Sequence, residues 1–210
     1  MFAVIFEVRP RPERWEEYLS IARMLRPELE RIEGFVENTR YRSTVREGVL
    51  LSLSLWRDEK ALIRWRTHAG HFAAQARGRE AVLADYRLRV GEVAALWDGG
   101  EIALPAQRLD VTDAGDAKAL AFAEGAFAEG EAAMPTDAMG SERFTALLEP
   151  SATLTMAGFG TEDAARAAIA PGSGRRFAVR VIRDYGLRDR REAPQYHVPV
   201  DRAAPRAMDQ

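Results

Sequence analysis

Histidine and tryptophan are concentrated in one short segment of this chain, residues 56–71. Two of the three histidines, His68 and His71, and two of the four tryptophans, Trp56 and Trp65, fall within it. A histidine can accept a proton near neutral pH, and a tryptophan offers a flat apolar wall with one N–H donor. Placed around a cavity, these side chains would suit a planar, apolar substrate that must lose a proton.

Each of these residues also has a structural interpretation. Trp65 could be only a core anchor, and Trp56, at the end of an apolar strand, could belong to the core or to a barrel interface. His71 and His68 could be helix caps or surface residues, and they have no third metal ligand nearby in sequence, so we expect no metal site. Asn38 is expected in mid-strand, where asparagine is disfavoured, and this points to function.

Composition excludes several classes of protein. The chain has 30 basic and 32 acidic residues and no cysteine. It is therefore not expected to bind nucleic acid or a membrane surface, and it has no disulfide or cysteine nucleophile. It also lacks the glycine-rich phosphate loops and the HExxH and GxSxG motifs. Without a signal peptide or an apolar run of roughly 20 residues, a cytoplasmic protein is predicted.

The first 98 residues have the pattern of a ferredoxin-like α+β domain with the order βαββαβ. Pro27 is expected to kink or divide the first helix, Gly34 to end it, and Gly70 to interrupt the second helical region. The expected elements are a strand over 2–8, a helix over 13–33, strands over 35–45 and 49–56, helices over 59–66 and 71–83, and a strand over 85–93.

A sheet of this kind carries helices on one face only, so the other face needs a separate cover. The strand over 49–56 illustrates this need, because three leucines alternate with Ser52, Ser54 and Trp56. A second copy of the same sheet is the common solution.

The second half of the chain supplies a candidate for that copy. Residues 142–159 echo residues 40–56, and a linker is expected at 97–101. We predict a tandem duplication that forms an intrachain α+β barrel, with a degenerate repeat over 101–191 and an extended or disordered tail over 192–210; an unrelated α+β tail is the alternative. The repeat's expected elements are a strand over 107–112, a helix over 116–134 and a last strand over 177–184.

The second copy has no equivalent of the tryptophan and histidine cluster. When the two segments are aligned, Trp65 falls on Ala168 and the histidines fall on the short turn 171–174. One site per chain is therefore expected, and His197 in the tail is taken as incidental. The chain could be a monomer with an internal pseudo-two-fold axis, or a homodimer if the halves do not pair.

Residues 1–95 resemble the antibiotic biosynthesis monooxygenase (ABM) family. The resemblance lies in a strand that ends in Leu-Trp, a helix start, and the joint Ile32-Glu33-Gly34-Phe35 between first helix and second strand. It continues through Trp65, His68, His71, Gln75, Gly78-Arg79 and Asp85-Tyr86-Arg87-Leu88-Arg89-Val90.

This resemblance implies a dimeric α+β barrel with a pocket between helices and sheet. Some members oxidise aromatic polyketides with O₂ and no cofactor, and others bind or degrade haem. Where the haem-degrading members have their haem-ligating histidine, this chain has Gln75, so we expect no cofactor, with haem as the alternative. The pocket would be lined by Asn38, Trp65 and a histidine.

The predicted function is that of a cofactor-independent monooxygenase acting with O₂ on a small aromatic or polyketide-like molecule. The alternatives are a haem-binding or haem-degrading protein, and a non-enzymatic small-ligand-binding or structural pseudo-dimer. Catalytic roles are predicted for His71, Trp65 and Asn38, and substrate contacts for His68, Trp56 and Tyr86.

Overall fold

Four strands form in the first half of the chain, where apolar residues alternate with polar ones. A computed structural model describes residues 1–97, 100–125, 138–169 and 174–194. The strands are all antiparallel, and in space the fourth lies beside the first, followed by the third and the second. They are β1 (Phe2–Pro10), β2 (Phe35–Ser43), β3 (Leu50–Trp56) and β4 (Leu83–Trp97).

The second half repeats this arrangement and closes the sheet into a barrel. Its strands β7, β8, β6 and β9 lie side by side in that order; β2 pairs with β7, and β4 with β9. A short β5 (Glu101–Ala103) extends the end of β4. The second strands of the two halves therefore pair with each other, and so do the fourth strands. The predicted intrachain α+β barrel is confirmed. The four strands are β6 (Ala119–Glu124), β7 (Gly140–Ala146), β8 (Thr153–Phe159) and β9 (Arg176–Gly186).

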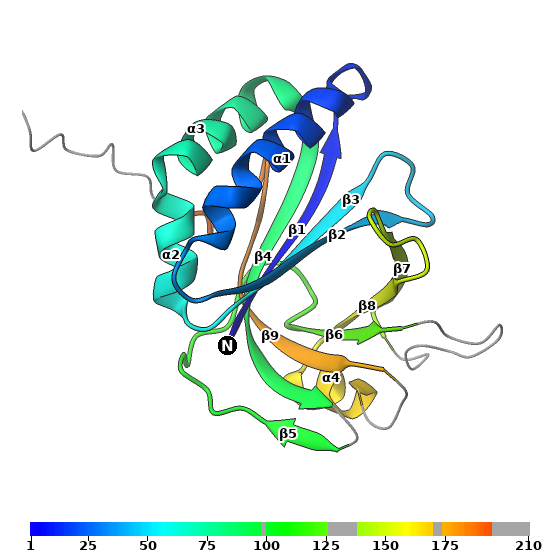
Figure 1. Cartoon of the computed structure of the whole chain (residues 1–210). Coiled ribbons are helices and arrows are strands. Elements are labelled where there is room, and N and C mark those ends of the chain that lie inside the picture. Colours follow the sequence, from blue (N-terminus) through cyan, green and yellow to red (C-terminus); the bar gives the residue numbers. More distant parts are fainter. Residues whose placement is uncertain (98–99, 126–137, 170–173, 195–210) are drawn as a thin grey trace, which may run out of the picture.

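Three α-helices cover the outer face of the first four strands, and one helix packs against the second half (Figure 1). The first is preceded by a 3₁₀ turn, Pro12–Arg14, and the third is followed by a π turn, Gly78–Val82. The α-helices are α1 (Trp15–Glu30), α2 (Glu59–Thr67), α3 (Ala69–Arg77) and α4 (Glu162–Ile169). Asp58 caps α2 by accepting a hydrogen bond from the Ala61 amide at 2.8 Å.

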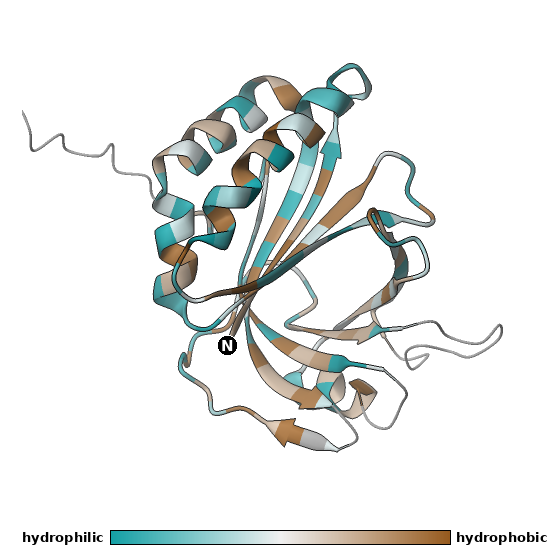
Figure 2. Cartoon of the chain, viewed as in Figure 1, coloured by the Kyte–Doolittle hydropathy of each residue, from teal (hydrophilic) through white to brown (hydrophobic). Residues whose placement is uncertain are grey.

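The two faces of the first-half sheet have different partners, as the strand alternation predicts. Leu51, Leu53 and Leu55 point into the barrel, where they pack with residues of both halves such as Phe122 and Phe177. The alternate residues of β3 face the helices. Figure 2 shows apolar and polar residues alternating along these strands. The middle of the barrel is therefore filled by apolar core, and a mostly apolar cavity lies on the helix side of the sheet. A second, more open hollow of about 540 Å³ lies at one end of the barrel and has a charged lining.

One end of the barrel interior holds a cluster of charges instead of apolar side chains. Arg89 and Arg46 both donate to Glu7, and Arg46 also reaches Glu142 from the second half. Burial raises the pKa of Glu7, but the guanidinium groups of Arg89 and Arg46 lower it further, so its pKa is below the usual value. The ion pair between Arg46 and Glu142 joins the two halves.

Several local predictions for the first half are corrected. Helix α1 is continuous through Pro27 and so is not divided there, because packing of Leu25 and Leu29 on the sheet offsets the hydrogen bond that proline cannot donate. The break before α3 falls at His68, whose ψ is 130°, and Gly70 lies inside α3. Gly34 has φ of +90° but follows the helix end by several residues; a Cβ there would lie 2.7 Å from the Ala61 Cβ.

Two predictions for the second half are wrong. Within the predicted helix over 116–134, residues Ala119–Glu124 form β6, and 126–137 lie outside the described residues. The alanines that suggested a helix are every second residue of a strand: they face α4, while Leu120 and Phe122 face the barrel core. The predicted strand over 107–112 is irregular, and its backbone is held by Glu92 and Arg180.

Most of the predicted C-terminal tail, including His197, lies outside the described residues. In the part of the chain that the structure describes, no helix is long and apolar enough to cross a membrane.

Candidate active site

A cavity of about 220 Å³ lies between the three first-half helices and the outer face of β1–β4. Its sheet wall is polar along two neighbouring strands, where Asn38 and Arg40 of β2 face Ser54 and Ser52 of β3. The rest of the lining is mostly apolar and includes Val4, Phe6, Ile21, Leu25, Leu29, Leu62 and Leu88. Such a lining suits a small molecule with an apolar body and few polar groups.

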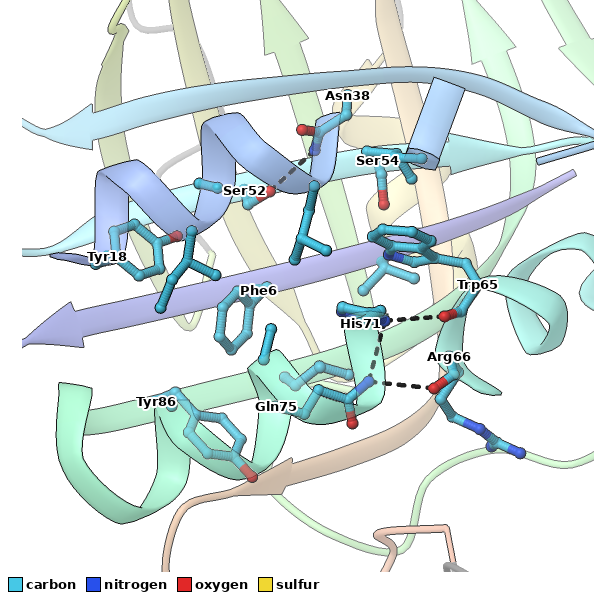
Figure 3. A pocket seen from close by; sticks show the side chains of 18 of the residues that line it. Phe6, Tyr18, Asn38, Ser52, Ser54, Trp65, Arg66, His71, Gln75 and Tyr86 are labelled. Atoms are coloured by element: carbon cyan, nitrogen blue, oxygen red, sulfur yellow. Dashed lines mark hydrogen bonds between the residues drawn. The ribbon is translucent and has the colours of Figure 1, made fainter. Parts of the chain in front are cut away.

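His71 enters this cavity from the first turn of α3. Its Nδ1 lies 2.9 Å from the carbonyl oxygen of Trp65 and 3.1 Å from the Gln75 amide nitrogen, which itself donates to the Arg66 carbonyl at 3.3 Å (Figure 3). The shorter contact is to a carbonyl oxygen, which only accepts, so the ring proton is assigned to Nδ1. With that tautomer the Gln75 amide nitrogen, also a donor, makes no hydrogen bond to Nδ1 and donates to the Arg66 carbonyl instead. The Nε2 atom then carries the lone pair, so His71 is arranged to accept a proton there.

Electrostatics keep this imidazole neutral. Loss of hydration lowers the pKa of His71 from 6.5 to about 4, although the hydrogen bond to the Trp65 backbone partly raises it, and the nearby His68 lowers it slightly further. The lone pair on Nε2 is therefore present at neutral pH. A proton accepted from a ligand would be stabilised if the resulting anion stayed beside the imidazolium.

Trp65 fixes the orientation of His71. The two rings are stacked, with centroids 4.2 Å apart and planes inclined by 12°. Trp65 lines the cavity and also stacks on His68, with a centroid distance of 5.7 Å. The indole thus forms a flat wall at the histidine end of the cavity.

Asn38 is tied to the neighbouring strand. Its Nδ2 donates to the Ser52 hydroxyl at 2.9 Å and to the Leu53 carbonyl at 3.1 Å. These bonds use both amide hydrogens, so the side-chain carbonyl oxygen is the part of Asn38 that remains able to accept from a ligand.

The opposite end of the cavity is formed by Tyr18 and Arg40. Burial raises the pKa of the Tyr18 phenol, while the adjacent Arg40 guanidinium, its hydrogen-bond partner, lowers it in part. Tyr86, also in the lining, packs against Phe6 with a centroid distance of 5.6 Å and accepts a hydrogen bond from Arg190.

The structure brings four of the predicted site residues together in the cavity lining: His71, Trp65, Asn38 and Tyr86. The other two lie elsewhere. Trp56 is fully buried beside Phe35 and donates to the Ser54 hydroxyl at 2.9 Å, so it supports the wall from behind. His68 lies outside the lining, with its Nδ1 3.4 Å from a Glu28 carboxylate oxygen.

Sequence reasoning missed Arg40 and Tyr18 as members of the site and did not assign Gln75 a role. Arg40 could have been found, because it lies two residues from Asn38 on one strand and so shares its face. Tyr18 gave no such signal beyond its place in the apolar stripe of α1. Among the described residues, no group of three or more histidine or acidic side chains could hold a metal ion.

The chain is thus an α+β barrel with a mostly apolar cavity, lined in part by His71, between its first-half helices and sheet. Residues 1–77 match the family described as Antibiotic biosynthesis monooxygenase. A protein named Jasmonate monooxygenase ABM, from Pyricularia oryzae, is 42% identical over 217 residues, covering 95% of this chain and all of the relative. The chain belongs to the antibiotic biosynthesis monooxygenase family.

Solved structures are more distant. A protein from Pseudomonas aeruginosa is 19% identical and covers 50% of this chain and 94% of its own, with a TM-score of 0.38. A protein from Fusobacterium nucleatum is 8% identical and covers 87% of this chain and 93% of its own, with a TM-score of 0.42.

Proposed function

We propose that this protein is a cofactor-independent monooxygenase that oxidises a small, largely apolar carbon acid with O₂, using His71 as the base. The observation that carries the proposal is the pairing of a mostly apolar cavity with an imidazole whose Nδ1 is held by the Trp65 carbonyl. Family membership and the monooxygenase name of the 42% identical relative support the reaction type.

The reaction balances without an external reductant when the substrate carries a CH₂ group activated by a carbonyl or an aromatic ring. His71 Nε2 removes one C–H proton, and the carbanion transfers an electron to O₂. Recombination forms a C–O bond and a peroxide. Loss of the second C–H proton breaks the O–O bond, giving a C=O group and water, so the CH₂ carbon supplies all four electrons that reduce O₂. The chain contributes desolvation and the movement of the proton.

The substrate class follows from the lining and from the relative. The apolar walls and the flat Trp65 indole favour a ring with a small number of polar groups. The relative's name points to jasmonate, a cyclopentanone carboxylic acid, as the first compound to test. Its ring ketone has the activated CH₂ that the scheme requires. Anthrone-type phenols and ketones form the second group of candidates.

The residues of the cavity do not fit haem. The position of the expected axial histidine is occupied by Gln75, whose amide nitrogen lies against His71 and the Arg66 carbonyl. His71 itself is stacked flat on Trp65. A porphyrin macrocycle also needs more room than a cavity of about 220 Å³. The proposed reaction therefore includes no haem.

A single chain is proposed to contain a complete site. Every lining residue lies between Val4 and Val90, and the second half of the same chain closes the barrel behind it. A second copy is therefore not required for the reaction.

Oxygen consumption tests the proposal. Purified protein is supplied with jasmonate and an anthrone panel under ¹⁸O₂, with and without NADH or NADPH. The expected result is oxygen uptake without nicotinamide and one labelled oxygen atom in the product. His71→Gln is expected to lose about 10²- to 10⁴-fold in kcat/KM, as for removal of a general base. The matched control His68→Gln removes the histidine that stacks on Trp65 from outside the cavity lining, and its loss should be far smaller than that of His71→Gln.

Absence of uptake across the panel, or an uptake that His71→Gln leaves unchanged, would overturn the proposed chemistry. Uptake that depends on a nicotinamide cofactor would retain the monooxygenase but remove its cofactor independence.

A further inference from the structure

Arg40 places a positive charge in the wall of this mostly apolar cavity. It lines the cavity from β2, and its Nε atom is buried without a hydrogen-bond partner. Among the described residues, no carboxylate forms an ion pair with it, whereas Arg26, at the rim of the same cavity, donates to Glu30 at 2.7 Å. Arg40 is therefore an uncompensated cation within the site.

An unpaired guanidinium at such a position is costly for the folded protein alone. Arginine stays protonated at any physiological pH, so it cannot relieve the cost by losing its proton. Its neighbours are neutral: the Tyr18 phenol beside it and Ser52 directly opposite on β3. The Arg40 side chain is partly buried, and its Nε atom is buried without a partner, so an anion from outside the chain would supply the contact that the chain itself does not.

The position of Arg40 within the cavity indicates how such an anion would lie. Figure 3 shows Tyr18, the neighbour of Arg40, at one end of the drawn side chains, and Trp65 with His71 toward the other end. Apolar side chains such as Phe6 lie between them. Arg66 also belongs to the lining, but its side chain points away from the cavity (Figure 3). Arg79 lines the cavity as well, but it has an interaction of its own, so Arg40 is a cation available to a bound ligand.

We propose that Arg40 is the specificity-determining anchor for a carboxylate on the substrate, so that the enzyme acts on apolar carboxylic acids held with their oxidisable carbon near His71. A planar guanidinium matches a carboxylate with two parallel hydrogen bonds. The Tyr18 hydroxyl is placed to donate a third. The placement of the oxidisable carbon near His71 rests on the proposed function. The binding of the carboxylate by Arg40 does not depend on turnover.

Equilibrium binding tests the anchor independently of turnover. Calorimetric titrations compare jasmonate with methyl jasmonate, and 4-phenylbutyrate with 4-phenylbutyramide, so that each pair differs only in the charged group. The wild-type protein is expected to bind the acids about 10- to 100-fold more tightly than their neutral partners, the range for a hydrogen bond to a charged group. Arg40→Gln should abolish this preference, and Arg40→Lys should retain part of it.

The matched control is Arg42→Gln. Arg42 lies two residues further along the same face of β2, but it is exposed and sits over the Trp15 ring outside the cavity lining. This variant should keep the full acid preference. Thermal unfolding of each variant verifies that it is folded, and retained affinity of Arg40→Gln for the neutral ligands shows that its cavity is intact.

Equal binding of acid and neutral partner by the wild-type protein, or an acid preference that survives Arg40→Gln, would overturn the anchor. An acid preference that depends on Arg40, without any oxygen uptake, would instead overturn the proposed function while leaving the anchor in place. Oxygen uptake with neutral substrates at the same kcat/KM as with acids would overturn the anchor while leaving the proposed function in place.

Discussion

Protonation of His71 should make the folded protein sensitive to mild acid, beginning at a higher pH than the titration of ordinary carboxylates. The folded-state pKa of His71 is lowered to about 4 from the ordinary 6.5 of the unfolded chain. Above pH 6.5 neither state binds the proton, so the stability is fully present. As the pH falls from 6.5 toward 4, the unfolded state binds a proton that the folded state does not, and stability is lost.

The size of this loss follows from the two pKa values. At pH 5 the unfolded histidine is almost fully protonated and the folded one largely neutral, which costs about 2 kcal/mol relative to pH 7.5. Complete loss, below pH 4, approaches about 3 kcal/mol. For a protein of ordinary stability, 5–15 kcal/mol in general, this is a substantial fraction.

Urea unfolding of wild type and His71→Gln at pH 7.5, 6 and 5 measures the effect. Other titrating groups change both proteins alike, so the difference between their unfolding free energies isolates His71. We expect the wild type to lose about 2 kcal/mol relative to the variant over this range. The Cε1–H proton shift of His71, followed by NMR, should show no protonation step near pH 6.5.

Parallel stability curves for the two proteins, or an NMR transition near pH 6.5, would show that His71 is hydrated and titrates normally. The assignment of a neutral, enclosed base would then be wrong. If the expected result is found, His71 stays in its basic form down to about pH 5, and the kcat/KM of the proposed reaction should not fall through loss of this base above that pH.

Two further predictions concern the barrel. Gly91→Ala places a Cβ 2.3 Å from a Val179 methyl carbon and 2.6 Å from the Arg180 carbonyl oxygen. The resulting overpacking between β4 and β9 should lower the free energy of unfolding in urea by about 1–3 kcal/mol. An unchanged free energy of unfolding would show that this strand pair can separate. Glu7→Gln leaves buried Arg89 uncompensated and should cost about 3–5 kcal/mol at pH 7. Because the folded-state pKa of Glu7 is lowered, its contribution is present above about pH 4.5 and disappears below it, so the wild-type and variant stabilities should converge in acid; a constant gap would contradict this.

The sequence predicted the features that depend on local periodicity. Alternation along β3 separated Leu51, Leu53 and Leu55 from the serines, and the structure places the two sets on opposite faces of the sheet. The grouping of tryptophan and histidine in residues 56–71 pointed to Trp65 and His71, which lie in one cavity because a short break at His68 lets α2 and α3 turn around it.

Alanine-rich periodicity failed where tertiary packing decided the outcome. Ala119–Glu124 has helix-favouring composition, yet it is a strand because it lies between β8 and β9 with the barrel core on one face and α4 on the other. A strand buried on both faces has no polar side to reveal its period of two. Pro27 was likewise overridden by packing of α1 on the sheet.

By itself, then, the sequence determined the order of the first-half elements, the two-faced sheet and the segment that carries the site. Only the tertiary structure decided which side chains share the cavity. Trp56 lies behind the cavity wall and His68 lies outside the lining, whereas Tyr18 and Arg40 belong to it. The reason is physical. Burial, hydrogen-bond partners and uncompensated charge are properties of the assembled environment, and the groups around Arg40 come from elements that only folding brings together.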